Sequence, residues 1–552
     1  MHSRMWRVMV AMLMALMVIG AISVSLNVMT VRAATNHRSV WLQPDRSLAA
    51  TPYTYTTVIT VTSGRDIDTN LGTTCSASPC TLRRAIVQAR NATAGQRPVL
   101  IRFNIPTTET QSYSSTLGIW HIYFLSSADT SVVRRLNGNI IIDGGTQPGG
   151  RASGPKIFLV GPSTDKDGPV VGDVAGNNGH IIRGLGFQNF GTHLFLNTNN
   201  NVIEDNWFGL NDAGTAPYLR NNNPQDGSGS GAIDTSGGTT GASSNTIQRN
   251  VFLGFDGTAI ALKGGGSNVV TDNWIGTNAN GVVTGKQTDP SLRCTTVDWL
   301  GGGGISLAGV GQVIQNNVIA GLRQEIFAIS TQPDALRVTV TGITGHTIQN
   351  NRIGVDASNA EVGVCGRGIL LTGDMQGTQI ISNTIVDSGL SGISMNDLLY
   401  DAATFRRNII KQTSGWSEVA GNPKPEDAIQ YGALLPAPFL VFKPAKVTAI
   451  TGTQVTGTAG EASACPNCVI EVFLDDNDAV TEAVQSLAVV TATAQGTWSA
   501  VLPAALTQGQ GLRTTSTTAQ FNTIANMNAG TTTGLSALYG VKYNVYLPLV
   551  KK

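Results

Sequence analysis

Charged residues are scarce in this 552-residue chain. They make up 13% of it and aromatic residues 6%, whereas charged residues are about 25% of an average protein. Lys and Arg number 36 against 35 Asp and Glu, which leaves a net charge of +1. Because no cationic run occurs either, we expect no nucleic-acid partner.

Helix-forming runs are also missing. The long Ala, Leu, Glu and Lys stretches of helical solenoids do not occur, and neither do the regular Leu-x-x-Leu-x-Leu runs of leucine-rich repeats. Past the N-terminus, no apolar run is long enough to cross a membrane as a helix. Glycine is abundant instead, with 64 residues.

A motif, Asn-x-Ile-x-x-Asn-x-Φ-Gly with Φ apolar, recurs through the middle of the chain, most clearly from Asn201, Asn245 and Asn268. Its second asparagine returns after steps as short as 23 and 25 residues. A unit of about 22 to 25 residues cannot bury its own apolar face, so the copies must stack as a solenoid. The second asparagines are Asn206, Asn250, Asn273, Asn317, Asn351, Asn383 and Asn408.

Apolar residues fall two apart within the copies, as along Ile181–Phe187, which is strand spacing. This favours a parallel β-helix, in which strands pair with the rungs above and below at about 4.8 Å. We expect each recurrent asparagine to pair through its amide with the equivalent asparagine one rung away, and to adopt the left-handed backbone of a turn. Ligand contact is the alternative role.

The N-terminus has the features of an export signal. Met1–Arg7 carries two arginines, Val8–Val24 is almost wholly apolar, and Ala33 and Ala34 offer a cleavage site. The apolar run borders on the length that spans a bilayer, so an uncleaved anchor is the alternative. We expect a secreted, extracellular or cell-surface protein, with membrane contact only through export or such an anchor.

Six cysteines in an exported chain predict disulfides. Cys465-x-x-Cys468 has a competing interpretation as a redox or zinc site, but no second cysteine pair or nearby histidine accompanies it. The spacing favours the pairs Cys75/Cys80, Cys294/Cys365 and Cys465/Cys468.

One amphipathic helix is predicted, over Cys80–Asn91, with Leu82, Ala85, Ile86 and Ala89 on one face. A solenoid needs such an element, because its open end exposes both core and strand edges. We therefore expect this helix to cap the N-terminal end.

Cys80-Thr-Leu-Arg-Arg-Ala85 resembles the Cys-Ser-Leu-Arg-Glu-Ala motif of the CSLREA-domain family of exported bacterial β-helix proteins, with Thr in place of Ser and Arg in place of Glu. Ile142–Gly149 and Ile182–Phe187 are similar to stretches that follow in that family. The resemblance covers roughly residues 55–415. It implies a β-helix and export, but says little about function, because the family has no agreed catalytic residues.

The repeats stop after Tyr431, and short alternating strands then predict a small β-sandwich. This region is similar to the immunoglobulin-like domain that trails such β-helices, although Thr514–Gly534 replaces its usual final strand with a Thr-rich stretch. The final residues, Tyr543–Lys552, resemble a C-terminal signature on exported proteins of the Chloroflexota. That likeness implies sorting or surface retention; a plain final strand is the alternative.

The predicted fold is all-β: a right-handed parallel β-helix with an N-terminal capping helix and a small C-terminal β-sandwich. The expected boundaries are a signal peptide over 1–34, an N-terminal segment and cap over 35–135, the parallel β-helix over 136–430, a linker over 431–446, the Ig-like β-sandwich over 447–525 and the tail over 526–552.

Catalytic candidates are weak. Cleavage of a polysaccharide needs clustered carboxylates, as an acid and base pair or as calcium ligands beside an arginine, and the polygalacturonase motifs are absent. The position before the second asparagine brings Asp205, Arg249 and Asp272 together in a stack, which predicts an ion-pair column and only secondarily a catalytic site. His180 and His346 precede repeat strands and are interpreted as stacked turn residues.

Asp475, Asp476 and Asp478 form an acidic loop that is a weak candidate for Ca²⁺. We expect no other cofactor.

The leading hypothesis is a non-enzymatic, adhesin-like protein, secreted or displayed at the surface, that binds a glycan or another cell-surface polymer. Trp207, Trp274 and Trp299 are its sugar-stacking candidates, but the first two share one repeat position, so packing in the core is their alternative role. The rival hypothesis is a polysaccharide lyase or glycoside hydrolase on a pectate-lyase-like β-helix. The ligand and the oligomeric state stay open.

Overall fold

The structure is a computed structural model, and several of the predictions fall outside the residues that it describes. These predictions concern the signal peptide, Trp299, Cys294 and the C-terminal signature. The described residues are 51–66, 75, 79–124, 135–163, 167–172, 178–219, 231–235, 241–255, 257–283, 303–322, 327–331, 345–372, 375–395, 403–412, 428–431, 442–459, 465–478, 480–521 and 527–540.

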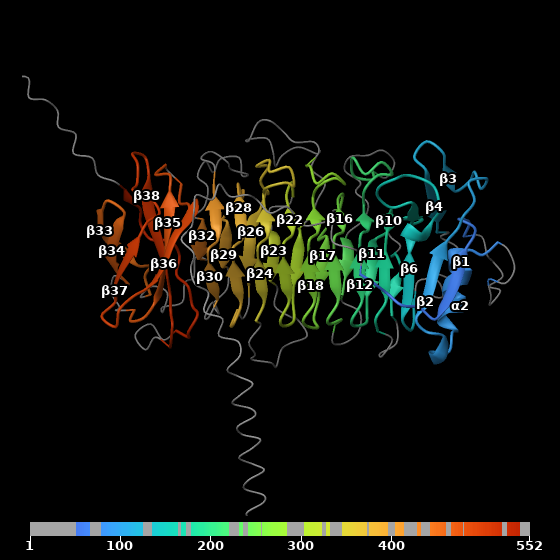
Figure 1. Cartoon of the computed structure of the whole chain (residues 1–552), viewed down its shortest axis with the longest axis horizontal. Helices are drawn as coiled ribbons and strands as arrows, with labels where there is room; N and C mark the ends of the chain where they lie inside the picture. Colours follow the sequence, from blue (N-terminus) through green and yellow to red (C-terminus); the bar gives the residue numbers. More distant parts are fainter. Residues whose placement is uncertain are drawn as a thin grey trace, which may run out of the picture. The chain divides into compact units, whose positions relative to one another are not determined.

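Three long sheets form the main body (Figure 1). Their strands pair in parallel, except β3 with β4, and each rung adds strands to the sheets in turn, which is a parallel β-helix. The predicted fold class is confirmed.

The first sheet holds β1 Thr57–Val61, β2 Val99–Phe103, β6 Ile140–Asp143, β9 Ile181–Arg183, β12 Val202–Glu204, β15 Thr246–Gln248, β18 Val269–Thr271, β21 Val313–Gln315, β24 Thr347–Gln349, β27 Gln379–Ile381 and β30 Thr404–Arg406. The second holds β3 Tyr113–Ser114, β4 Ile119–Tyr123, β7 Ile157–Val160, β10 Leu185–Gln188, β13 Trp207–Phe208, β16 Val251–Phe252, β19 Trp274–Ile275, β22 Val318–Ile319, β25 Arg352–Ile353, β28 Thr384–Val386 and β31 Ile409–Lys411. The third holds β5 Arg135–Leu136, β8 Val170–Val171, β11 Thr192–Leu196, β14 Gly231–Asp234, β17 Ile260–Leu262, β20 Ile305–Leu307, β23 Phe327–Thr331, β26 Arg367–Leu371, β29 Ile393–Met395 and β32 Ile429–Tyr431.

The register stacks like residues on one another in the interior. In the second sheet, Phe187, Phe208 and Phe252 stack with ring centroids 4.7 and 5.0 Å apart. The first sheet contributes a column of β-branched residues, each at most 1% exposed, and such side chains pack well on a pleated surface. The members are Ile182, Ile203, Ile247, Val270, Ile314, Ile348 and Ile380.

The seven recurrent asparagines form a ladder between the first and second sheets. From Asn206 to Asn408, each Nδ2 donates to the Oδ1 of the asparagine one rung on, at 3.0–3.1 Å. All are buried. Backbone N–H groups such as those of Asn250 and Asn273 donate to the same oxygens, which satisfies donors that have no strand partner there.

The expected left-handed backbone of these asparagines was wrong. The residue before each one turns the chain instead, with φ between 52° and 57°. The turn points that preceding side chain outward and leaves the amide directed inward, where its partner lies. The turning residues are Asp205, Arg249, Asp272, Asn316, Asn350, Ser382 and Arg407.

A second column runs at the other end of the same strands, from His180 through Asn201, Asn245 and Asn268 to Gln312 and His346. In each case a side-chain atom accepts a hydrogen bond from the backbone of the previous rung. His180 Nδ1 accepts from Ile140 at 3.2 Å and His346 Nδ1 accepts from Gln312 at 3.3 Å. Both histidines are buried and are used structurally.

The helix α2, Leu82–Arg90, packs against β1 and β2 and is the one α-helix among the described residues. Thr81 caps its N-terminus by accepting from the backbone of Arg84. Its apolar face is buried, and Arg83 forms a buried ion pair with Asp66 at 2.6 Å. Two short 3₁₀ turns, Ala94–Gln96 and Gly144–Thr146, complete the helical content of the described chain.

The C-terminal region holds two antiparallel sheets. One contains β33 Lys446–Thr451, β34 Gln454–Thr458 and β37 Thr497–Val501; the other contains β35 Val469–Asp475, β36 Gln485–Thr491, β38 Gly511–Thr517 and β39 Tyr539–Gly540. The Thr-rich stretch thus begins inside a regular strand, β38.

Disulfides join Cys75 to Cys80 and Cys465 to Cys468, as the spacing predicted. Cys365 is also disulfide-bonded.

Candidate functional site

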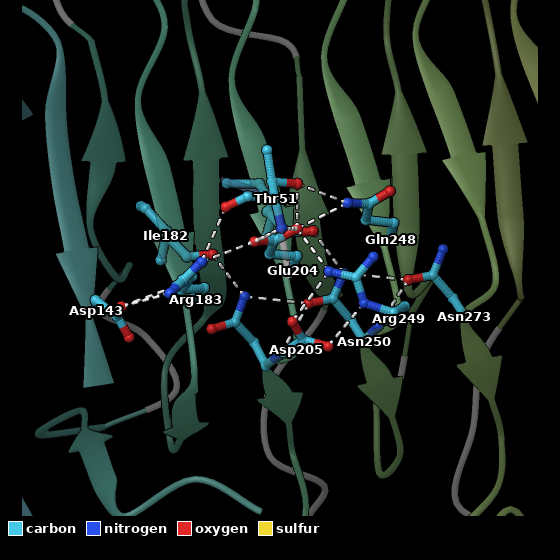
Figure 2. A network of polar contacts seen from close by, with 12 residues as sticks. Thr51, Asp143, Ile182, Arg183, Glu204, Asp205, Gln248, Arg249, Asn250 and Asn273 are labelled. Atoms are coloured by element: carbon cyan, nitrogen blue, oxygen red, sulfur yellow. Dashed lines mark hydrogen bonds and ion pairs between the residues drawn. The ribbon is translucent and has the colours of Figure 1, made fainter. Parts of the chain in front are cut away.

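Two of the three catalytic candidates meet on the outer face of the first sheet (Figure 2). Arg249 Nε lies 3.0 Å from Asp205 Oδ1, and Arg249 Nη2 lies 2.7 Å from Glu204 Oε2. Asp272, on the next rung, accepts a hydrogen bond from the hydroxyl of Thr271. The Arg249 side chain is only 4% exposed and is held by two carboxylates.

Glu204 is the centre of this network, and the sequence analysis missed it. Its side chain is 0% exposed. It accepts hydrogen bonds from Thr51 Oγ1 at 2.6 Å, Gln248 Nε2 at 2.7 Å and Arg249 Nη2 at 2.7 Å. Arg183 Nη1 lies 3.5 Å away. Burial alone would raise the pKa of Glu204, but the hydrogen bonds from Thr51 and Gln248 and the charge of Arg249 lower it below its usual range.

The segment that begins at Thr51 closes the network from one side. Tyr53 donates to Asp143 Oδ2 at 2.7 Å, and the Arg183 guanidinium lies 4.4 Å from the centre of the Tyr53 ring. Burial, and then the hydrogen bond to Asp143, raise the pKa of Tyr53 to about 12. These contacts occupy the carboxylates of Glu204 and Asp143, so the network braces the sheet.

A cleft of about 720 Å³ lies over the second sheet, on the outer side of β13. It combines an aromatic ring, a guanidinium, a carboxylate and several small polar groups. Its lining residues are Thr116, Leu117, Arg151, Ser153, Gly154, Asp205, Trp207, Ala213, Gly214, Ala279 and Asn280.

The cleft owes its shape to a turn that follows β13. The side chain of Asn211 accepts from the backbone of Thr215 and so closes the turn. Gly214 has a φ of 72°, and a Cβ there would lie 2.4 Å from the Trp207 ring. Two rungs further along the solenoid, a Cβ on Gly281 would lie 3.1 Å from the Trp274 ring. Each glycine lets a turn pack against the edge of an indole.

Trp207 and Trp274 share one register position on the outer face of the second sheet, with Val251 between them. Both are half-buried, so neither belongs to the interior core. Both rings pack against the cluster that contains Val251 and Leu253, and Trp207 also lines the cleft. Of the two tryptophans that the structure describes here, Trp207 is the one placed to contact a ligand in the cleft.

Arg151 forms the cationic wall of the cleft, and no sequence motif pointed to it. Its guanidinium lies 4.5 Å from the centre of the Trp207 ring and 5.2 Å from that of Phe158. Nη1 donates to the backbone oxygen of Asp212, while Nε and Nη2 have no hydrogen-bond partner among the described residues. Burial lowers the pKa of Arg151 to about 10, so the group is still a cation at neutral pH.

A histidine–aspartate pair adjoins Arg151. His121 Nε2 lies 3.0 Å from Asp212 Oδ1, and Gln188 Nε2 donates to the same oxygen at 3.0 Å. The His121 ring stacks on Tyr123. Burial would raise the pKa of Asp212, but the hydrogen bond and charge of His121 lower it. Burial, followed by the charge of Asp212, raises the pKa of Tyr123 and of Tyr218.

The acidic cluster in the structure differs from the predicted Ca²⁺ site by one residue. Asp475 is 0% exposed and pairs with Arg513, so its inclusion was wrong. The strand alternation of β35 turns Asp475 inward, whereas Asp476 and Asp478 project from the turn that follows. Glu482 completes their cluster instead.

Comparisons with known proteins leave the site open. A sequence profile of the family described as "Periplasmic copper-binding protein (NosD)" matches residues 163–292, less than half of the chain. No curated protein matches the chain.

Solved structures resemble the chain only distantly. The A-module of mannuronan C-5 epimerase AlgE4 from Azotobacter vinelandii is 11% identical, with a TM-score of 0.36 over 63% of this chain and 90% of that one. The catalytic domain of a GH87 α-1,3-glucanase is 13% identical, with a TM-score of 0.30 over 70% of each chain. The tailspike of E. coli bacteriophage HK620 is 11% identical, with a TM-score of 0.28 over 78% of this chain and 87% of that one. At these values the likenesses carry no argument.

Copper does not fit the matched stretch. Copper sites are built from Cys, Met and His ligands, and residues 163–292 contain no Cys or Met. Its two histidines, His180 and His193, are both 0% exposed, and His180 Nδ1 already accepts from the backbone of Ile140. We therefore assign no copper site to this stretch.

Proposed function

We propose that the chain is an exported, non-enzymatic β-helix protein that binds a glycan or a similar surface polymer in the cleft over the second sheet. The cleft carries this proposal. A sugar ring presents C–H groups on its faces and hydroxyls at its rim, and the cleft offers Trp207 for the first and Ser153 and Asn280 for the second. Arg151 adds a cation without a carboxylate within salt-bridge distance among the described residues, which favours an acidic sugar.

Export supports the proposal. The N-terminus carries the features of a signal peptide, and disulfides persist in oxidising compartments. In the part of the chain that the structure describes, no helix is long and apolar enough to cross a membrane.

A bulky side chain placed at the edge of the cleft should block it without disturbing the buried core of the solenoid. Ala213 and Thr215 are both exposed in one turn, but only Ala213 lines the cleft. A glycan array with the mature protein identifies a ligand, and calorimetry then compares Ala213→Tyr with the control Thr215→Tyr. We expect Ala213→Tyr to weaken binding at least about tenfold, which is about 1.4 kcal/mol, and Thr215→Tyr to leave it unchanged. Equal affinities would place the ligand elsewhere.

A second variant tests whether the charge of Arg151 contributes to binding in the cleft. Arg151→Gln removes the cation, so it is expected to weaken binding of acidic glycans more than that of neutral ones. Equal effects on both classes would show that Arg151 only shapes the cleft.

A polysaccharide lyase is the second candidate, because His121 and Asp212 adjoin Arg151. In such a reaction His121 takes the proton from the carbon next to a uronate carboxylate, and a carbon–carbon double bond forms. The glycosidic bond breaks, its electron pair stays on the leaving oxygen, and that oxygen takes a proton from water. Hydrolysis has less support, since it needs two carboxyl groups that act as acid and base. Here Asp205 is paired with Arg249, and Asp212 is held ionised by its hydrogen bonds.

A further inference from the structure

Three carboxylates converge in the turn after β35. Asp476, Asp478 and Glu482 each place one oxygen within 4.8 Å of an oxygen of the other two. Asp476 and Asp478 are exposed, whereas Glu482 is only 1% exposed. The spacing Asp-x-Asp-x-x-x-Glu thus brings two surface carboxylates onto one buried carboxylate.

Glu482 has one oxygen that the protein leaves without a partner. Its Oε1 accepts from the backbone N–H of Gln412 at 2.5 Å, but its Oε2 is buried and accepts from no donor in the described chain. Burial, and then the negative charges of Asp476 and Asp478, raise the pKa of Glu482 to about 8, so without a cation Glu482 holds a proton at neutral pH, within hydrogen-bonding reach of Asp476. A cation bound to Oε2 would displace that proton and balance the buried carboxylate, which is costly when it is ionised and unpaired.

The basic side chains nearby form ion pairs with other acidic residues. Arg513 pairs with the buried Asp475, and Lys411 Nζ lies 2.8 Å from Glu361. No ion pair to Asp476, Asp478 or Glu482 is present among the described residues. The charge of Lys411 acts on Glu482 from a distance, but no described basic side chain forms an ion pair with the cluster.

We propose that Asp476, Asp478 and Glu482 bind one Ca²⁺ ion. Ca²⁺ takes six to eight oxygen ligands in a flexible geometry, often from carboxylates and water. One buried carboxylate and two exposed ones fit that pattern, with water completing the shell on the open side. Mg²⁺ demands a near-ideal octahedron and keeps its water more firmly, so it suits this turn less well.

The position of Glu482 gives the ion a structural consequence. Gln412, which Glu482 Oε1 holds, follows β31, the last strand of the second sheet. The next residue, Ala483, exchanges backbone hydrogen bonds with Ile410 of β31 at 3.0 and 2.9 Å. An ion bound to Glu482 therefore strengthens the attachment of the C-terminal sheets to the final rung, and it acts apart from the glycan cleft.

The test uses the full mature chain, first stripped with a chelator and then titrated with Ca²⁺. Calorimetry is expected to show one bound ion at this cluster, and the melting temperature should rise with Ca²⁺ until that site saturates. Asp478→Asn keeps the oxygen that accepts from the backbone of Val480, so it should fold normally and bind Ca²⁺ at least tenfold more weakly. Asp234→Asn, which removes an acid on the third sheet, is the control and should bind normally.

Glu482→Gln separates the role of Glu482 as a ligand from its role in packing. It keeps an acceptor for Gln412, and in chelator, where the wild-type Glu482 is mostly protonated at neutral pH, it should melt close to the wild type. In saturating Ca²⁺ it should melt below the wild type, because it gains nothing from the ion. A wild-type protein that binds no Ca²⁺ at millimolar concentration, or an Asp478→Asn variant with full affinity, would overturn the proposal.

Discussion

A buried charge is tolerated on the outer face of the first sheet because its neighbours satisfy it. Glu204 lies in register with Arg183 on one side and Gln248 on the other, and Thr51 covers it. Exposed ion pairs contribute little to stability, but removal of one partner from a buried pair leaves the other charge unbalanced. The contribution of this network should therefore appear only when a partner is lost.

Replacing Glu204 by Gln should destabilise the protein by about 3 kcal/mol at neutral pH. The pKa of Glu204 is lowered in the folded state, so the unfolded chain takes up its proton first as the pH falls. This stabilisation is thus complete above the ordinary glutamate pKa of about 4.3 and is lost as the pH falls through the lowered value. Urea midpoints at neutral and acidic pH should converge between wild type and variant.

Asp234→Asn is the control for this comparison, since the Asp234 pair with Lys263 is partly exposed. It should change stability by less than about 1 kcal/mol. If the Glu204→Gln difference is as large in acid as at neutral pH, packing and not charge explains it.

Single residues also show where sequence reasoning reaches its limit. Asp205 and Arg249 were expected to pair because they share a repeat position, whereas Thr51 joins Glu204 across 153 residues and follows no periodicity. In the acidic loop, proximity in sequence suggested Asp475, but strand alternation buries it. Contacts that depend on the return of a distant segment are invisible to spacing.

At the scale of the element, the repeat predicts the rung well because each copy meets the same geometry. The strands, the inward isoleucines and the amide ladder can all be predicted from the spacing of the repeated motif. The left-handed turn was assigned to the wrong residue for a physical reason. Asparagine tolerates the left-handed backbone, but its side chain must point inward to reach the next asparagine of the ladder. The residue before it therefore adopts the positive φ, even where that residue is Arg249 or Ser382, for which this backbone conformation is uncommon.

Asn273→Ala should cost about 2 to 4 kcal/mol, because it removes the acceptor of the Asn250 N–H and the donor to Ile247 and Asn317. Asn280→Ala, at an exposed position, should change stability by no more than about 0.5 kcal/mol. Thermal or urea unfolding of the two variants makes the comparison. Equal losses would mean that the ladder contributes nothing beyond burial.

At the scale of the whole molecule, the cleft is built from parts that the repeat does not describe. Arg151 and His121 precede the clear copies of the motif, and Asp212 belongs to a turn whose length varies between rungs. The sequence could therefore predict the sheet beneath the cleft and the position of Trp207 on it. It could not predict Arg151 and His121, because the residues that join the rungs do not recur at a fixed spacing.

The mature protein is expected to leave pectin, polygalacturonate and alginate intact, with or without added calcium. Function depends on the site and not on the fold, and the described carboxylates near the cleft are already engaged: Asp205 by Arg249, and Asp212 by His121 and Gln188. Calcium at the C-terminal cluster should raise the melting temperature without producing activity. The measurement is the appearance of unsaturated or reducing ends. Their reproducible release, lost on replacing His121, Asp205, Arg249 or Asp272, would favour the enzyme over the binding protein.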